Sequence, residues 1–215
     1  MSSQNRLKIT EIFLSIQGES DLVGWPTVFV RLTGCPLRCT WCDTPYSFHG
    51  GQWMDFDAIL DRIRELGASR VCVTGGEPLA QKRCTQFLRL LCDEGLTVSL
   101  ETSGALDISE VDPRVIKVLD LKAPGSGEQH RNLWSNLEHL GSNDQIKLVI
   151  ADRADFDWAA ARIEDRQLKR WQVLLSPVWD QLHPRELAEW ILESGLQVRL
   201  QLQMHKYLWG NEPGH

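Results

Sequence analysis

The stretch TVFVRLTGCPLRCTWCDT, residues 27–44, indicates both how this sequence folds and what it can bind. Its first six residues, 27–32, form a short run of β-branched and apolar side chains that is typical of a buried strand. The loop that follows directly carries Cys35, Cys39 and Cys42 in C-x3-C-x2-C spacing. Such a compact loop can point three thiolates at one centre. Four thiolates would close an iron–sulfur cluster, whereas three leave one iron open to a small molecule.

A zinc site is the structural alternative for this loop, with a nearby histidine such as His49 as the fourth ligand. Zinc ligands in structural sites usually come as two pairs of residues. The sequence contains no second pair at a suitable spacing. The loop therefore favours a four-iron cluster with one open iron.

A second motif, Thr74-Gly75-Gly76-Glu77-Pro78, follows the strand-like run RVCVT. Two adjacent glycines let backbone approach a ligand closely because no Cβ intervenes, and a carboxylate beside them can pair with an ammonium group. Taken alone, the motif is more simply a strand-to-helix turn with a proline early in the helix. Next to the cysteine loop, ligand binding becomes the better interpretation.

Strand-like and helix-like segments alternate along the rest of the chain. Short β-branched runs lie at residues 27–32, 70–74, 97–101, 115–121, 145–150, 171–176 and 197–202, and helical patterns lie near residues 55–67, 87–95, 133–141, 156–166 and 184–195. This alternation predicts a mostly parallel sheet with helices outside it. A closed eight-unit barrel takes about 250 residues. The prediction is therefore α/β: a partial, incompletely closed (β/α) barrel of about six strands.

The whole chain, residues 1–215, reads as one domain, because no composition shift or charge block marks a boundary. Residues 7–20 are expected to add an edge strand or to cap the mouth of the barrel. Polar or small residues end several strands, at 101–104, 120–122 and 176–177. Active sites of (β/α) barrels lie at the carboxyl ends of their strands, so these segments are expected to meet at one rim, although each could be an ordinary turn.

Composition limits the partners. The 215 residues carry 23 Lys and Arg against 29 Asp and Glu, a net charge of −6 that argues against broad nucleic-acid binding. No apolar run approaches a membrane span, and the N-terminus lacks a signal-peptide layout. We therefore expect a cytoplasmic protein whose six cysteines stay reduced, free to bind metal or to pack.

The cysteine loop and the TGGEP segment together resemble those of the radical S-adenosylmethionine superfamily, in which an aromatic residue precedes the last cysteine, as Trp41 does here. The resemblance implies a [4Fe–4S] cluster whose open iron binds the amino and carboxylate groups of S-adenosylmethionine. The reduced cluster then cleaves this cofactor to a 5′-deoxyadenosyl radical. Within the superfamily, Gln17-Gly18-Glu19, Asp43-Thr44 and His205-Lys206-Tyr207 closely resemble the 7-carboxy-7-deazaguanine synthase family.

The family resemblance covers residues 12–209 and implies a lyase of queuosine and deazapurine biosynthesis. The reaction implied converts 6-carboxy-5,6,7,8-tetrahydropterin to 7-carboxy-7-deazaguanine with loss of ammonia. S-adenosylmethionine is regenerated in each turnover, Mg²⁺ assists, and no catalytic side chain is implied beyond the cluster and the cofactor radical. An electron donor such as flavodoxin or ferredoxin is needed.

The resemblance also implies a set of site residues, carried over by position. Cluster ligands are Cys35, Cys39 and Cys42, and the Mg²⁺ ligand is Thr44. Residues implied in S-adenosylmethionine binding are Trp41, Cys42, Asp43, Gly76, Glu77, Ser103, Asp120, Leu121 and Lys122. Residues implied in pterin binding are Ile16, Gln17, Gly18, Arg31, Thr74 and His205. The Arg31 guanidinium could pair with the substrate carboxylate through two hydrogen bonds.

The sequence departs from the family pattern at two places, and two other functions remain open. Ser20 stands where the family commonly has glycine, and the chain continues past Leu208 with a glycine- and proline-containing tail. A glycyl-radical activase shares the cysteine loop without needing the other motifs, and a zinc-stabilised binding module would not be an enzyme. A small open barrel leaves apolar edges exposed, so a homodimer is expected.

Overall fold

The computed structural model describes residues 5–212 and 214 of the chain. Within these residues one nine-stranded sheet runs in the order β3-β1-β2-β4-β5-β6-β7-β8-β9. Neighbours from β2 to β9 pair in parallel, whereas β1 pairs antiparallel with β2 and with β3. The strands are β1 (Arg6–Ile16), β2 (Pro26–Leu32), β3 (Gln52–Asp55), β4 (Arg70–Gly75), β5 (Thr97–Thr102), β6 (Ile116–Leu121), β7 (Gln145–Ile150), β8 (Gln172–Pro177) and β9 (Arg199–Leu200).

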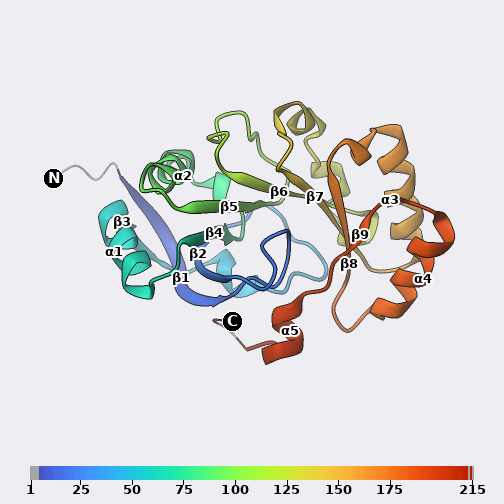
Figure 1. The fold of residues 1–215 in the computed structure, drawn as a ribbon, viewed down its shortest axis with the longest axis horizontal. Helices are drawn as coiled ribbons and strands as arrows, with labels where there is room; N and C mark the ends of the chain where they lie inside the picture. Colours follow the sequence, from blue (N-terminus) through green and yellow to red (C-terminus); the bar gives the residue numbers. More distant parts are fainter. Residues whose placement is uncertain (1–4, 213, 215) are drawn as a thin grey trace.

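In the described part of the chain, four α-helices flank the sheet and a fifth lies apart from them. Figure 1 shows α1 and α2 beside the first strands and α3 and α4 beside the last ones, while α5 lies below the sheet in this view. The helices are α1 (Phe56–Leu66), α2 (Cys84–Asp93), α3 (Arg153–Asp165), α4 (Pro184–Ser194) and α5 (Met204–Trp209). Strands β3 and β9 end the sheet order without pairing to each other in the described residues, so the barrel is partial and open, as predicted.

The alternation of side chains along each strand separates a core from a cavity. On β2, Val28, Val30 and Leu32 belong to the buried apolar core, which includes α1 and α2 residues. Phe29 and Arg31 point to the other side and line a cavity. Because successive side chains of a strand point to opposite faces, the same strands supply the packing that stabilises the fold and the polar groups of the site.

Most of the predicted strands and helices are confirmed, and β1 and β9 differ in position or length. Residues 7–20 were expected at the edge of the sheet or over its mouth. Instead, β1 lies between β2 and β3, and the cavity is lined by Phe13 and Ile16 near its end and by Gln17 and Glu19 after it. Strand β3 was not predicted, because its residues are mostly exposed and show no apolar alternation. Strand β9 is shorter than the segment 197–202 predicted.

The helix predicted near residues 133–141 is wrong: the segment is a 3-10 helix, Trp134–His139. The buried side chain of Asn136 explains the difference. Its Nδ2 donates to the carbonyls of Gly104 (3.2 Å) and Leu106 (2.8 Å), and its Oδ1 accepts from the N–H of Ile108 (3.2 Å). The Asn136 side chain thus satisfies the backbone hydrogen-bonding groups of a neighbouring loop. These bonds hold the segment against that loop in place of a regular amphipathic helix.

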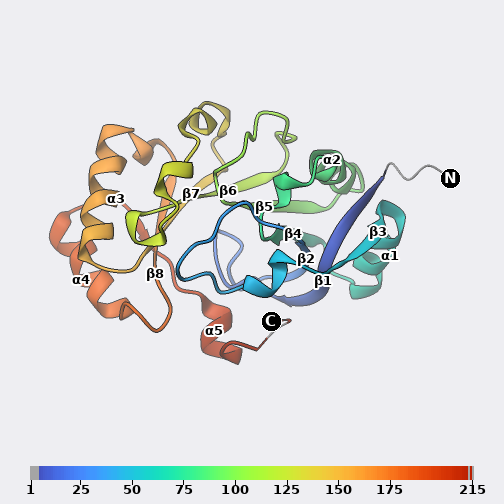
Figure 2. The ribbon, with the colours of Figure 1, turned by 180° about the vertical axis from the view of Figure 1, so that it is seen from behind.

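The loop between β2 and β3 crosses the open side of the sheet. Figure 2 shows it swinging away from β2 toward the opposite end of the sheet before it returns to the short 3-10 helix Pro45–Phe48. Within the described residues, no helix has the length and apolar character needed to cross a membrane.

Candidate functional site

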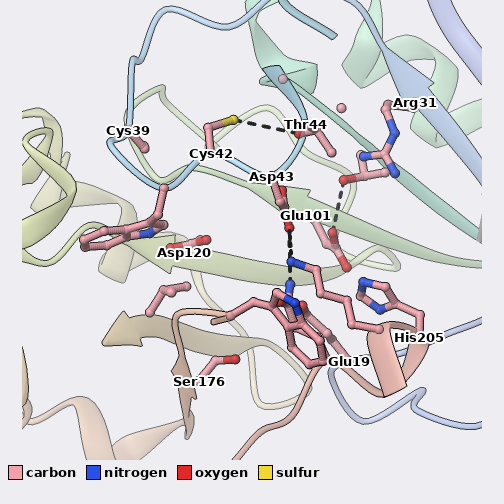
Figure 3. Close-up of a pocket in the computed structure, with 18 of the residues that line it drawn as sticks. Glu19, Arg31, Cys39, Cys42, Asp43, Thr44, Glu101, Asp120, Ser176 and His205 are labelled. Atoms are coloured by element: carbon pink, nitrogen blue, oxygen red, sulfur yellow. Dashed lines mark hydrogen bonds and ion pairs between the residues drawn. The ribbon is translucent and has the colours of Figure 1, made fainter. Parts of the chain in front are cut away.

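A cavity of about 670 Å³ lies where the carboxyl ends of the parallel strands meet the cysteine loop. Of the site residues implied by the sequence, all except Gly18, Glu77 and Leu121 line it. Figure 3 shows Cys39, Cys42, Asp120, Ser176, Glu101 and His205 arranged around this space, although they come from distant parts of the chain. The strand ends therefore meet at one rim, as the strand-end pattern predicted.

The cysteine loop is fixed to the far side of the barrel by its own polar groups. Thr40 donates from its N–H to the carbonyl of Ser126 (3.1 Å) and from Oγ1 to the carbonyl of Gly125 (2.8 Å). The N–H of Arg38 donates to a carboxylate oxygen of Glu128 (2.6 Å). These contacts bring the loop to the segment after β6, so that cysteines from one loop face polar residues from another.

The three cysteine side chains fit a cluster better than a single ion. Cys35, Cys39 and Cys42 are half-buried, free and line the same cavity. Burial raises the pKa of the Cys39 thiol to about 11, so a bound metal would have to displace its proton. Within residues 5–212 and 214, no three His, Cys, Asp or Glu side chains converge closely enough to hold one metal ion. Three free thiols on one cavity wall fit the three cysteine ligands of a four-iron cluster that has one open iron.

His49, the histidine considered as a zinc ligand, is not among the residues that line this cavity. Its ring packs edge-on against Phe48, with centroids 6.5 Å apart. Thr44 does line the cavity, and its Oγ1 lies 4.0 Å from the Sγ of Cys42. The loop thus presents a hydroxyl beside the thiols, and the histidine does not join them.

The glycine turn after β4 packs directly on the cysteine loop. A Cβ added at Gly76 would lie 2.4 Å from the carbonyl oxygen of Gly34 and 2.8 Å from the Cβ of Cys35. The N–H of Glu77 donates to the same Gly34 carbonyl (2.8 Å). Only glycine permits this approach, so the turn supports the thiol loop as well as the cavity wall.

Glu77 does not reach the cavity, although the sequence placed its carboxylate beside a ligand amine. Its side chain is fully buried and accepts hydrogen bonds from the N–H of Leu79 (2.9 Å), from Thr102 Oγ1 (3.0 Å), and from the N–H (2.7 Å) and Oγ of Ser103. The carboxylate therefore joins the end of β4 to the end of β5. In this structure it orients Ser103, which does line the cavity.

The end of β6 supplies an ion pair and a spare acceptor. Lys122 Nζ lies 3.1 Å from Asp120 Oδ2, while Asp120 Oδ1 is buried with no hydrogen-bond partner. A buried acceptor without a partner is costly unless a ligand or water satisfies it. Leu121 between them is fully buried and points away from the cavity. The two neighbours of Leu121, and not its own side chain, can contact a ligand.

The segment after β1 and the last helix form the opposite wall. Gln17 is buried, and its Nε2 donor has no partner although the residue lines the cavity. The N–H of Met204 donates to the carbonyl of Gly18 (3.0 Å), and a Cβ at Gly18 would lie 2.1 Å from Nδ1 of His205. Gly18 therefore acts through close packing, holding His205 at the cavity wall.

Arg31 is already partly engaged by the protein. Its Nε donates to Glu11 Oε1 (2.6 Å), and the same oxygen accepts from the hydroxyl of Tyr46 (2.9 Å). The guanidinium is nearly buried, and among residues 5–212 and 214 its ion pair with Glu11 is made through Nε. Glu11 thus orients Arg31 and leaves donors for a second anion, as the sequence interpretation requires.

A partly buried lysine on β7, Lys147, was not predicted. Lys147 forms a close ion pair with Glu19, and both line the cavity. Burial alone would lower the pKa of Lys147, but the carboxylates of Glu19, Asp120 and Glu101 raise it above its usual value, so the ammonium group stays charged. The signal was a lysine at an inward position of an otherwise apolar parallel strand, which is rare without a partner.

Glu101 was given no role from the sequence, although it begins the strand-end segment 101–104 that was expected at the rim. One of its oxygens accepts from Thr74 Oγ1 (3.0 Å). Burial and the charge of Glu19 raise the pKa of Glu101 above its usual value, against the opposing effect of Lys147. The cavity thus contains one carboxyl group that protonates more readily than an ordinary glutamate.

The tail closes one side of the cavity. Gly210, Asn211, Glu212 and Gly214 are among its lining residues. Pro213 and His215 of the same tail lie outside the described residues.

Comparison with known proteins identifies clear relatives. Residues 29–121 match the family model described as the radical SAM superfamily. The chain is 45% identical to a 7-carboxy-7-deazaguanine synthase from Chlorobaculum tepidum, with 97% of both chains covered, and 42% identical to one from Koribacter versatilis, with 96% and 98% covered. The crystal structure of QueE from Escherichia coli is similar at a TM-score of 0.74 and 25% identity, over 95% of this chain and 100% of that one.

Proposed function

The chain belongs to the 7-carboxy-7-deazaguanine synthase family of the radical S-adenosylmethionine superfamily, and on that premise we propose how its cavity divides between cluster, cofactor, substrate and cation. The enzyme is a lyase of the queuosine pathway that converts 6-carboxy-5,6,7,8-tetrahydropterin to 7-carboxy-7-deazaguanine with loss of ammonia. A [4Fe–4S] cluster and S-adenosylmethionine are its cofactors. When bound, the reduced cluster supplies the electron that starts the radical chemistry on S-adenosylmethionine.

The observation that carries this division is the meeting of four segments at one cavity: the cysteine loop, the glycine turn after β4, and the ends of β5 and β6. Cys35, Cys39 and Cys42 would hold the cluster from one side. Gly76, Ser103 and the Asp120–Lys122 pair would border the cofactor, with Trp41 and Asp43 along its adenosyl group. The unpartnered Oδ1 of Asp120 supports this role, because a ligand donor would satisfy it.

The substrate half of the proposal rests on the wall opposite the cysteines. Ile16, Gln17, Thr74 and His205 would surround the pterin, and Arg31 would bind its carboxylate. The unpartnered Nε2 of Gln17 is a buried donor that a substrate oxygen or ring nitrogen would satisfy. Gly18 would act through His205, and Glu77 through Ser103.

Mg²⁺ belongs to the same proposal, with Thr44 as its protein ligand. A threonine hydroxyl is a hard oxygen donor that suits Mg²⁺, while water and substrate oxygens complete its coordination. The position of Thr44 on the cavity wall beside Cys42 supports this assignment. A cation there would orient the substrate and stabilise charge that shifts during ring contraction.

Thr44→Val tests the cation site, because valine keeps the shape of the side chain and deletes its oxygen. We expect the variant to keep its cluster and to cleave S-adenosylmethionine, yet to lose most of the stimulation of product formation by Mg²⁺. Product formation is measured with and without Mg²⁺ in both proteins. Equal stimulation of the wild type and the variant would remove Thr44 from the site and leave it as the residue that begins the 3-10 helix.

The remaining partners are proposed on chemical grounds. A small electron carrier such as flavodoxin or ferredoxin would reduce the cluster, and the six free thiols suit a reducing cytoplasm. We further propose that the chain acts as one domain in a homodimer. The sheet ends in the two-residue strand β9, and Leu192 of the adjacent α4 is 80% exposed. Open sheet edges and exposed apolar side chains favour association.

A further inference from the structure

Lys206 is a buried charge on α5, next to two exposed residues of the same helix. The side chains of Tyr207 and Leu208, its neighbours on α5, are 55% and 54% exposed, whereas Lys206 is only 9% exposed. Lysine is rarely buried unless its ammonium group has a partner. The orientation of Lys206 toward the cavity therefore calls for an explanation that packing of α5 alone does not give.

The ammonium group of Lys206 meets two segments that lie far from it in the sequence. Its Nζ is 3.4 Å from Oδ2 of Asp43, the residue directly after the last cysteine of the loop. It also lies 5.7 Å from the ring centroid of Trp179, in the segment that follows β8. Lys206 thus joins α5 to the cysteine loop on one side and to the end of the barrel on the other.

Neighbouring residues of α5 and its N-terminal flank reinforce the same two contacts. Gln203 Nε2 donates to Asp43 Oδ2 (3.3 Å), the oxygen that also faces Lys206. Tyr207 packs edge-on against Trp179, with ring centroids 5.2 Å apart. In Figure 3, dashed lines end on the carboxylate of Asp43, which receives the contacts of Gln203 and Lys206. Lys206 and Gln203 thus both contact the same carboxylate oxygen of Asp43.

The position of α5 affects the shape of the cavity, because residues of the helix and of the segments before and after it line the cavity. Gln203, His205 and Lys206 line it directly, and Gly210 and Asn211 continue the wall after the helix ends. The contact between Gly18 and His205 fixes one end of α5 to the pterin side. The pair of Lys206 and Asp43 fixes the helix to the cluster side. Both sides of the site are therefore closed by one short helix.

We propose that Lys206 is a positioning residue that keeps α5 closed over the cavity by pairing with Asp43, so that cleavage of S-adenosylmethionine occurs only around enclosed substrate. This inference deepens the proposed function and rests on it. An ammonium–carboxylate pair that is half-exposed on the Asp43 side is weak enough to open for substrate exchange. Closure of such an element keeps water and product loss away from a reactive intermediate.

The test compares how well cofactor cleavage is coupled to product in four proteins. Lys206→Met keeps the length and apolar stem but removes the charge, and Lys206→Arg restores a charge. Lys169→Met is the matched control, because Lys169 is an exposed lysine that pairs with Glu164 (3.1 Å) far from the cavity. Each reconstituted holoenzyme is given substrate, S-adenosylmethionine and reductant. Released 5′-deoxyadenosine and 7-carboxy-7-deazaguanine are then counted.

We expect Lys206→Met to release several-fold more 5′-deoxyadenosine per product formed, because the cofactor fragments escape before they recombine. Its KM for S-adenosylmethionine should rise by up to about fivefold, which corresponds to the free energy that one partly exposed ion pair contributes. Lys206→Arg should recover most of the coupling, and Lys169→Met should behave as the wild type. The amide of Met204 is bonded to the carbonyl of Gly18, and the amide of Gly210 to the carbonyl of Lys206; hydrogen exchange at both should be faster only in Lys206→Met.

Unchanged coupling in Lys206→Met, in a wild-type background that makes product, would overturn the role of Lys206. Faster exchange with unchanged coupling would also overturn it, since α5 would then be loosened without consequence for the chemistry. Failure of the wild type itself to form product would instead contradict the proposed function. The two failures are thus distinguishable in one set of measurements.

Discussion

At Ser20 a single side chain occupies a backbone conformation that usually belongs to glycine. Its φ is +66°, in the left-handed region, at the position where glycine is common in the family. The loop thus keeps the glycine conformation despite the substitution, which the sequence alone could not show. The side chain contributes in return, because Ser20 Oγ accepts from the N–H of Leu22 (3.2 Å).

The variants Ser20→Gly and Ser20→Ala should therefore differ in stability, with the glycine variant the more stable. Alanine keeps the strained Cβ and loses the hydroxyl, whereas glycine loses the hydroxyl but relieves about 1 kcal/mol of left-handed strain. We expect the free energy of unfolding to be lower in Ser20→Ala than in Ser20→Gly by about 1 kcal/mol. Urea unfolding followed by tryptophan fluorescence measures it. Alanine at least as stable as glycine would mean that the backbone at residue 20 is not left-handed.

Glu101 gives a pH-dependent prediction. Its pKa is raised in the folded chain by burial and by Glu19, so the unfolded chain releases this proton first as the pH rises above about 4.5. The free energy of unfolding is therefore lowered, relative to that of a chain with a neutral side chain at residue 101, as the pH rises above about 4.5. Glu101→Gln should raise the free energy of unfolding of the cluster-free chain at pH 7, with a gain that shrinks toward pH 4.

The control for Glu101→Gln is Glu65→Gln, at an exposed carboxylate that pairs with Arg62 (2.9 Å) on the surface of α1. Its effect on the free energy of unfolding should be small. A gain for Glu101→Gln that is the same at pH 4 and pH 7 would show that Glu101 titrates as an ordinary glutamate. Substrate turnover in Glu101→Gln should fall even as stability rises, because the carboxyl faces the cavity.

At this scale, spacing and resemblance pointed to most of the cavity wall, but not to the direction of every side chain. Glu77 and Leu121 both lie in the expected motifs. The carboxylate of Glu77, however, accepts hydrogen bonds from Thr102 and Ser103, and the side chain of Leu121 points into the core. Lys147 was missed because its partner Glu19 lies 128 residues away. A motif identifies neighbours along the chain, whereas an ion pair across the barrel depends on the fold.

At the scale of elements, the glycine turn after β4 and the cysteine loop act as one unit. From sequence, Gly76 matters only because backbone must approach the cofactor. In the structure a side chain at residue 76 would meet Gly34 and Cys35 before it met any ligand. A substitution there should therefore disturb the thiols themselves.

Gly76→Ala should reduce the iron bound per chain after reconstitution, because a Cβ would lie 2.4 Å from a backbone oxygen that cannot move independently of the loop. Gly141→Ala is the control, since a Cβ there makes only an ordinary contact at 3.6 Å with Asp144. Iron and sulfide content and the visible spectrum give the result. A full cluster in Gly76→Ala, with weakened S-adenosylmethionine binding alone, would restore the simpler interpretation from sequence.

Elements with strong periodic patterns were predicted well, and those without them were not. Helix α4 begins and ends where Pro184 and Gly195 indicated, because proline fits the first turn and Gly195 adopts a left-handed φ of +68°. Strand β3 is stabilised by pairing with β1 rather than by its own apolar pattern. The conformation of the segment Trp134–His139 depends on the hydrogen bonds that Asn136 makes to a loop thirty residues earlier in the chain.

At the scale of the molecule, an open barrel brings a cluster loop, a cofactor rim and a closing helix around one cavity. Counting strand–helix units predicted that the barrel would be incomplete, since the chain is too short for eight. What the count could not give is how the open side is covered. The cysteine loop covers part of it through Thr40 and the segment after β6, and α5 covers another part through Lys206 and Asp43.

The central claim is that this cavity performs a ring contraction with loss of ammonia. The most direct measurement is anaerobic turnover of 6-carboxy-5,6,7,8-tetrahydropterin by the reconstituted chain with S-adenosylmethionine, Mg²⁺ and a reductant, beside Cys35→Ala. We predict 7-carboxy-7-deazaguanine and ammonia in equal amounts, in excess over released 5′-deoxyadenosine, and no product from Cys35→Ala. A cluster-containing wild type that cleaves S-adenosylmethionine but leaves the pterin unchanged, or product from Cys35→Ala, would contradict it.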